Sequence, residues 1–120
     1  MSRIIIFSIL FLAFVIYSYF VYTKGSTANA IVMNAEATNG KLLFQKYNCS
    51  ACHQVYGLGG YLGPELTTVI SQHGKGEAYA KAFLKSGSQR MPDFHLSDQE
   101  IKDLLEFLKY MDATAVSNYN

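Results

Sequence analysis

Charged residues and cysteines are both scarce in this 120-residue chain, and each shortage excludes a class of protein. Only 16% of the residues are charged, half are apolar, and the formal net charge is +1 with neutral histidines. The chain has no long run of lysine or arginine, which argues against a polyanionic partner such as nucleic acid. Its apolar content is too high for a disordered protein.

Runs that alternate between apolar and polar residues, which would indicate half-buried strands, are also absent, as are internal repeats. Helical patterns are present instead. A short helix is expected to begin at an N-cap on Thr38 or Asn39 and to lead toward the cysteines. A second helix is expected over residues 76–87, ending at Gly87. Between them, residues 54–66 are rich in glycine and predict an irregular loop.

The clearest helix covers residues 97–111. Ser97 and Glu100 have the spacing of a capping box. Apolar residues then recur at helical spacing and form one stripe, made of Ile101, Leu104, Leu105, Leu108 and Met111. Together these patterns predict an all-α fold.

A long apolar segment lies near the N-terminus. Ile4–Tyr22 holds nineteen residues without a charge, and as a helix it would span roughly 28 Å, close to the hydrocarbon core of a bilayer. We therefore expect a single transmembrane anchor in residues 1–24 and a linker in residues 25–37. The alternative is a cleaved signal peptide, because residues 28–30 read A-N-A, although a signal h-region is usually only about 7–15 residues long. In both cases the rest of the chain is exported.

The only two cysteines, Cys49 and Cys52, stand three positions apart and are followed directly by His53. A structural zinc site would need four ligands, usually in two pairs, and the chain has no second pair. A thioredoxin-like motif would follow a strand, and no strand is evident. A disulfide across two intervening residues would stabilise little. The remaining interpretation is C-x-x-C-H, the attachment signature of a c-type haem, with two thioethers and a histidine ligand to iron.

Several residues could complete the iron coordination. Met33 precedes the motif in the linker, and Met111 lies on the apolar stripe of the last helix, where a core role is favoured. Met91 is followed by a proline, which restricts it to an extended backbone on a loop that can reach over the haem. Met91 is therefore favoured as the second ligand to iron over His73 and His95, which are expected to be exposed loop histidines, with His95 as the runner-up. A thioether ligand raises the reduction potential and suits one-electron transfer.

These residues resemble class I cytochromes c. The resemblance rests on Gly40 and Phe44 before the motif, G-P-E-L at 63–66, Met91-Pro92, and the terminal "LLEFLKY". It implies a cytochrome c domain at residues 38–113 with a tail at 114–120. It also implies that the carbonyl of Pro64 accepts a hydrogen bond from His53 Nδ1, and that Leu66 and Arg90 belong to the haem surroundings. Gly40 would allow the first and last helices to cross closely, against Leu104 and Phe107.

A closer resemblance is to the cytochrome c subunit of bacterial nitric oxide reductase. It rests on the anchor, on "GKLLFQKYNCSACHQVYGLGGYLGPELTTV" and on "RMPDFHLSDQEIKDLLEFLKY". The loop "GLGGYLGPEL" is similar to the family's G-E-G-A-Y-x-x-P-E-L, with Leu58 and Gly60 in place of glutamate and alanine. The region between Thr68 and Arg90 is shorter than in that family.

The resemblance implies a non-catalytic subunit in the bacterial inner membrane, with its haem domain on the periplasmic side. It would take electrons from a soluble donor, a small cytochrome c or a cupredoxin, and pass them to a large multi-span haem-copper-type subunit. Gly59 and Tyr61 match positions that hold a bridging calcium ion, although Tyr61 could instead cover the haem edge. The alternatives are a stand-alone membrane-anchored shuttle, a subunit of another terminal oxidase, a haem-based sensor, and a thiol oxidoreductase.

Overall fold

The computed structural model describes residues 2–25 and 31–115, so the proposed cleavage site at 28–30 and most of the predicted tail lie outside the described residues. The chain divides into two compact units, Met1–Val32 and Met33–Asn120. The first contains helix α1 (Ser2–Phe20) and a π-helical turn, η1 (Val21–Gly25). The segment Arg3–Gly25 is 23 residues long, has a mean hydropathy of 2.6, and is long and apolar enough to cross a membrane.

The second unit is mostly helical, as the sequence predicts. Its elements in chain order are α2 (Ala35–Lys46), the 3₁₀ turn η2 (Cys49–Ala51), β1 (Gln54–Val55), β2 (Leu58–Gly59), α3 (Glu77–Ser86) and α4 (Asp98–Thr114). The two strands were not expected. They form a small antiparallel hairpin, with Gln54 opposite Gly59 and Val55 opposite Leu58. Strands of two residues are too short to produce an alternating pattern in the sequence.

Helix α2 begins earlier than the sequence suggested, and the expectation of an N-cap at Thr38 or Asn39 was wrong. The N-cap is Asn34, whose side chain accepts a hydrogen bond from the Ala37 backbone N–H at 2.7 Å. Ala37 is 2% exposed, so the added turn is held by packing as well as by the cap. Met33 packs against the core, although the sequence placed it in the linker.

Helix α4 agrees with the sequence. Ser97 and Glu100 form the predicted capping box, and the Ser97 backbone N–H holds the pKa of the Glu100 carboxyl below its usual value. The apolar stripe is buried, with Met111 1% exposed at its end. The predicted helix at 76–87 is α3, and it ends at Gly87 as expected. The hydrophobic core is therefore built largely on one face of α4.

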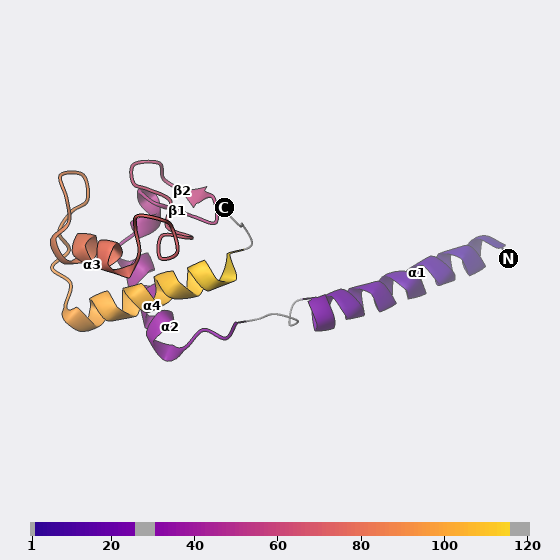
Figure 1. The fold of residues 1–120 in the computed structure, drawn as a ribbon. Coiled ribbons are helices and arrows are strands. Elements are labelled where there is room, and N and C mark those ends of the chain that lie inside the picture. Colours follow the sequence, from indigo (N-terminus) through magenta and orange to yellow (C-terminus); the bar gives the residue numbers. More distant parts are fainter. Residues whose placement is uncertain (1, 26–30, 116–120) are drawn as a thin grey trace. The chain divides into compact units, whose positions relative to one another are not determined.

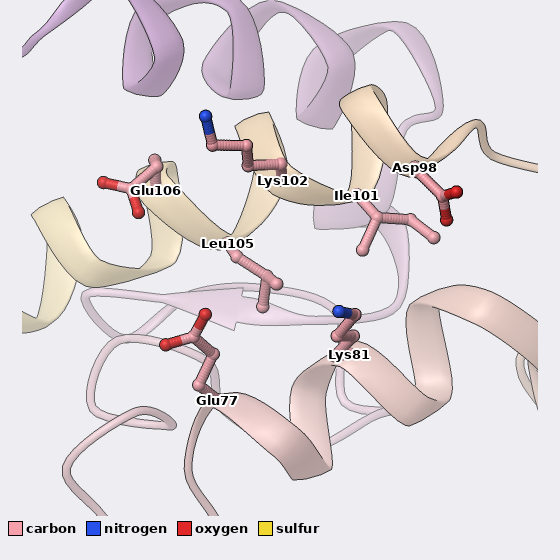
Figure 2. Close-up of a pocket in the computed structure, with 7 residues that line it drawn as sticks. All are labelled: Glu77, Lys81, Asp98, Ile101, Lys102, Leu105 and Glu106. Atoms are coloured by element: carbon pink, nitrogen blue, oxygen red, sulfur yellow. The ribbon is translucent and has the colours of Figure 1, made fainter.

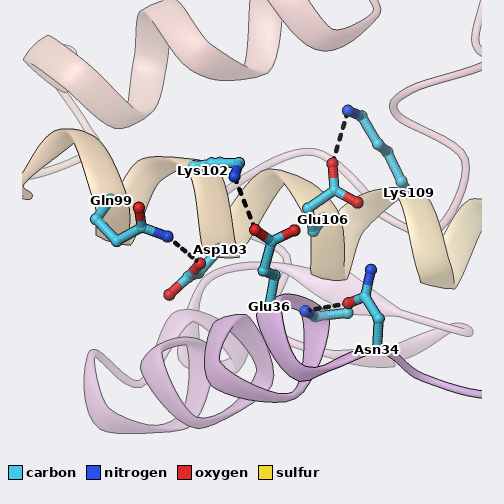
Figure 3. Close-up of polar contacts among 8 residues, drawn as sticks. Asn34, Glu36, Gln99, Lys102, Asp103, Glu106 and Lys109 are labelled. Carbon is cyan, nitrogen blue, oxygen red and sulfur yellow. Dashed lines mark hydrogen bonds and ion pairs between the residues drawn. The ribbon is translucent and has the colours of Figure 1, made fainter.

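Helices α2 and α4 cross closely in the second unit (Figure 1). A Cβ at Gly40 would lie 2.9 Å from Cβ of Phe107 and even closer to the backbone carbonyl of Asp103. The predicted contact with Phe107 is thus present, but Asp103, one position before Leu104, meets the glycine most closely. Polar contacts also link the two helices at this crossing, where Lys102 Nζ donates to Glu36 Oε1 at 2.7 Å (Figure 3).

Replacing Gly40 with alanine is expected to destabilise the domain by about 3 kcal/mol, since overpacking against rigid backbone typically costs 1–3 kcal/mol and occasionally more. Chemical denaturation of the haem-loaded protein measures this change. Asn39→Ala, an exposed substitution one position earlier in α2, is the control. Equal stability of the two variants would show that the helices can separate at little cost.

Candidate haem site

The C-x-x-C-H motif forms a single tight turn after α2. Asn48 adopts a left-handed conformation with φ of 51° and begins the turn. The backbone N–H groups of Cys52 and His53 both donate to the carbonyl of Cys49, at 3.2 and 3.0 Å. Because one helical turn separates the two cysteines, both thiols can face the same side of the turn.

A cavity of about 500 Å³ opens beside this turn. Most of the side chains around it are apolar or aromatic. Its lining contains all the residues that the sequence assigned to the haem and its surroundings, namely Cys49, Cys52, His53, Pro64, Leu66, Arg90 and Met91. The structure therefore brings these predicted residues together from three separate segments of the chain.

The ring of His53 is fixed by backbone. Its Nδ1 donates to the Pro64 carbonyl at 2.8 Å, so the predicted hydrogen bond is present. This leaves Nε2 with its lone pair available for a metal, the arrangement usual for histidine ligands. A Cβ at Gly63 would lie only 2.6 Å from Nδ1. A glycine is therefore required for the loop to lie against the ring.

The other glycines of this loop serve the same close packing. For Gly59, Gly60 and Gly63 the nearest surface is the chain's own residues 50–53. Gly60 N donates to the Ser50 carbonyl at 2.9 Å, and Gly63 N donates to the Cys52 carbonyl at 2.8 Å. The glycine-rich loop thus packs closely against the C-x-x-C-H turn.

Met91 reaches the cavity from a closed turn that follows α3. Ser88 and Met91 bond to each other twice: the Ser88 N–H donates to the Met91 carbonyl at 2.8 Å, and the Met91 N–H donates to Ser88 Oγ at 3.2 Å. The competing residues Met33, Met111, His73 and His95 are not part of the cavity lining. Both of these histidines are exposed, and His95 pairs with Asp93 at 3.3 Å.

The electrostatics of the cavity suit an anionic, largely apolar group. Among the described residues that line it, only Arg90 carries a full charge at neutral pH. Arg90 has no ion-pair partner within the described part of the chain.

Burial raises the pKa of the Cys49 thiol. A thiol oxidoreductase needs a cysteine whose pKa is lowered, and the raised pKa of Cys49 does not favour that role for this thiol.

The aromatic residues of the cavity were not assigned from the sequence. Tyr47 and Phe94 meet with ring centres 5.2 Å apart, and Tyr79 and Phe83 with ring centres 4.8 Å apart. Tyr79 and Phe83 are four positions apart on α3, which was a signal for one aromatic face. Tyr47 and Phe94 come from distant segments, and only the folded chain brings them together.

Gly59 and Tyr61, the residues matched to a calcium site, lie outside the cavity lining, and Tyr61 is 87% exposed. Within residues 2–25 and 31–115, no group of three or more His, Cys, Asp or Glu residues could hold a metal ion.

A second, smaller cavity of about 270 Å³ lies between α3 and α4 (Figure 2). Five of its seven lining residues are charged, so it does not suit an apolar macrocycle.

Comparison with known proteins agrees with the geometry. The family model described as "Cytochrome C oxidase, cbb3-type, subunit III" matches residues 35–108. The nitric oxide reductase C subunit of Stutzerimonas stutzeri is 36% identical over 92 residues, which cover 68% of this chain and 62% of that protein. The chain thus spans less than two thirds of that relative. The same subunit of the Paracoccus denitrificans reductase is 27% identical over 127 residues, covering 96% of this chain and 84% of the relative.

A third relative, "Cytochrome c-553-like" of Synechocystis sp. (strain ATCC 27184 / PCC 6803 / Kazusa), is 30% identical over 104 residues. The match covers 87% of this chain and 95% of the relative. The family model spans the chain from α2 into α4, and therefore includes the C-x-x-C-H turn, the glycine-rich loop and Met91. The chain belongs to the cytochrome c family that this model describes, in which the haem is covalently bound.

Proposed function

We propose that this protein is a membrane-anchored monohaem cytochrome c that accepts single electrons and delivers them to the catalytic subunit of a nitric oxide reductase. The observation that carries the proposal is one cavity lined by Cys49, Cys52, His53 and Met91. The relatives named as nitric oxide reductase C subunits support the assignment to that complex.

Each lining residue has a role in this proposal. The thiols of Cys49 and Cys52 would hold the haem covalently through its vinyl groups, and His53 Nε2 and Met91 Sδ would bind its iron. When bound, the haem supplies a one-electron couple at its iron. The Pro64 carbonyl fixes the orientation of the His53 ring. Leu66 contributes to the apolar lining of the cavity, and Arg90, its charged side chain, would pair with a haem propionate. With both His53 and Met91 bound, the iron would have no open position for a gas, which argues against a gas sensor.

The segment Arg3–Gly25 anchors the protein in the bacterial inner membrane with the haem domain on the periplasmic side. Its length and hydropathy support a membrane span. Attachment of haem c outside the cytoplasmic membrane favours this orientation. The electron donor is then a soluble periplasmic protein, a small cytochrome c or a cupredoxin.

The electron acceptor is a large multi-span haem-copper-type subunit, and the loop around Tyr61 contacts it. Leu58 and Tyr61 lie outside the cavity lining and are each at least 77% exposed, and exposed apolar groups of this kind favour protein contacts. The carbonyl of Gly59 and the hydroxyl of Tyr61 contribute to a calcium ion whose remaining oxygen ligands come from the partner. A second candidate function, a subunit of an oxygen-reducing terminal oxidase, is favoured by the description of the matching family.

Purification of the tagged chain from native membranes tests the proposal. We expect the large subunit to co-purify and the complex to consume nitric oxide when the haem c is reduced. Consumption of oxygen instead would identify the terminal oxidase, and a chain recovered alone would indicate a stand-alone shuttle. Tyr61→Ala should lower recovery of the large subunit about tenfold, the size of one lost interface anchor, without changing the haem spectrum.

Tyr61→Phe is the matched control, because it keeps the ring and removes the calcium ligand. If calcium bridges the subunits, Tyr61→Phe and chelation should both weaken the complex. If only the ring matters, Tyr61→Phe should behave like the unmodified protein. Full recovery of the complex with Tyr61→Ala would show that this loop does not contact the partner.

A further inference from the structure

The loop that carries Pro64 is held by a closed set of hydrogen bonds centred on Thr67. Thr67 is 5% exposed. Its hydroxyl accepts from the Tyr56 backbone N–H at 2.6 Å and donates to the Glu65 carboxylate. The Thr67 backbone N–H also donates to Glu65 Oε1, at 3.0 Å. The Thr67 hydroxyl both accepts and donates a hydrogen bond, and the Thr67 N–H donates to the same carboxylate, so these bonds hold the loop in one conformation.

This set of bonds lies next to the haem-binding residues in the sequence and in the fold. Pro64, whose carbonyl accepts from His53, directly precedes Glu65. Leu66 and Val69, on either side of Thr67, line the cavity. The Leu66 N–H donates to the Gln54 carbonyl at 2.9 Å, one residue beyond His53. A shift of Thr67 would therefore be transmitted to the Pro64 carbonyl through three peptide units.

Tyr56 connects the same set to α4. It has a φ of 52°, an uncommon value for a residue with a side chain. Its hydroxyl bonds to Thr114 Oγ1 at 2.6 Å and donates to the Met111 carbonyl at 3.4 Å. The backbone N–H of Tyr56 donates to the Thr67 hydroxyl. The cavity loop is thus fastened to the end of the longest helix of the domain.

We propose that Glu65 and Thr67 are positioning residues that set the strength of the His53–Pro64 hydrogen bond, and through it the reduction potential of the haem. This rests on the proposed function, in which His53 is an axial ligand. A hydrogen bond weakens steeply as its angle and distance depart from the optimum. Donation from Nδ1 makes the imidazole a stronger donor to iron. A stronger donor stabilises the ferric state, so loosening the loop raises the potential.

Thr67→Val in the full-length haem-loaded protein removes the hydroxyl while preserving the shape of the side chain. We expect a higher midpoint potential in a redox titration, with the six-coordinate spectrum unchanged. Thr67→Ser retains the hydroxyl and should restore the original potential. Thr68→Val is the matched control, because the neighbouring hydroxyl makes no hydrogen bond in the part of the chain that the structure describes. It should leave the potential unchanged.

Solvent exchange of the His53 ring N–H, followed by NMR, reports the hydrogen bond directly. Thr67→Val removes about one hydrogen bond from the loop, so the His53 ring N–H should exchange with solvent roughly tenfold faster. If Thr67→Val yields no holoprotein, Glu65→Ala gives the same information, because Glu65 is only partly buried. Lower stability with unchanged potential and exchange would overturn the proposal. Absence of histidine coordination in the unmodified protein would instead refute the proposed function.

Discussion

Cys52→Ala is expected to reduce the yield of holoprotein by more than tenfold, because we expect the fold of the domain to depend on its haem. Phe44, Val69, Leu104 and Leu108 belong to the hydrophobic core and also line the cavity. A cavity of about 500 Å³ left unfilled would cost on the order of 10 kcal/mol at ~24 cal/mol per Å³. That is an upper bound, since water can enter an open cavity, but it matches the whole stability of a typical domain.

The measurement is haem retained by the polypeptide after acid–acetone extraction, together with the yield of folded protein. Ser50→Ala is the control, because Ser50 is an exposed residue between the two cysteines and only its carbonyl is used in the loop. It should give normal holoprotein. Complete release of haem from the unmodified protein would contradict covalent attachment. Normal accumulation of Cys52→Ala would show that the domain does not depend on the second thioether.

The C-x-x-C-H turn and helix α4 could be predicted because their signals are local. Cys49, Cys52 and His53 lie within one helical turn, and the capping box and apolar stripe of α4 lie within one helix. The contact between His53 and Pro64 was implied only by a resemblance to cytochromes c. Its geometry depends on the loop lying against the ring at Gly63, and no local pattern specifies that packing.

The errors in prediction have physical causes of the same kind. Asn34, Thr38 and Asn39 are all good N-cap residues, and the burial of Ala37 against the core decides in favour of Asn34. At the crossing of α2 and α4, the residue opposite Gly40 depends on the relative rotation of two helices. The sequence of either helix alone does not determine that rotation. Long-range packing therefore decided what local signals left open.

Met91→His is expected to lower the midpoint potential by on the order of a few hundred millivolts, since axial ligands alone move haem potentials over about 0.8 V. Among the methionines that the structure describes, Met91 alone lines the cavity. Its thioether is a soft ligand that favours ferrous iron, whereas imidazole favours the ferric state. The two hydrogen bonds with Ser88 hold the Met91 backbone in place, so the change should be confined to the ligand.

The oxidised protein should show the weak sulfur-to-iron charge-transfer band, and Met91→Ala should abolish it. Met33→Ala is the matched control, because Met33 is partly buried against the core but lies outside the cavity lining. It should keep both the band and the potential. Persistence of the band in Met91→Ala would assign the ligand to another methionine. If the unmodified protein has no such band and His95→Ala changes its spectrum, the second axial ligand is His95, and the exposed position of that side chain must change when haem binds.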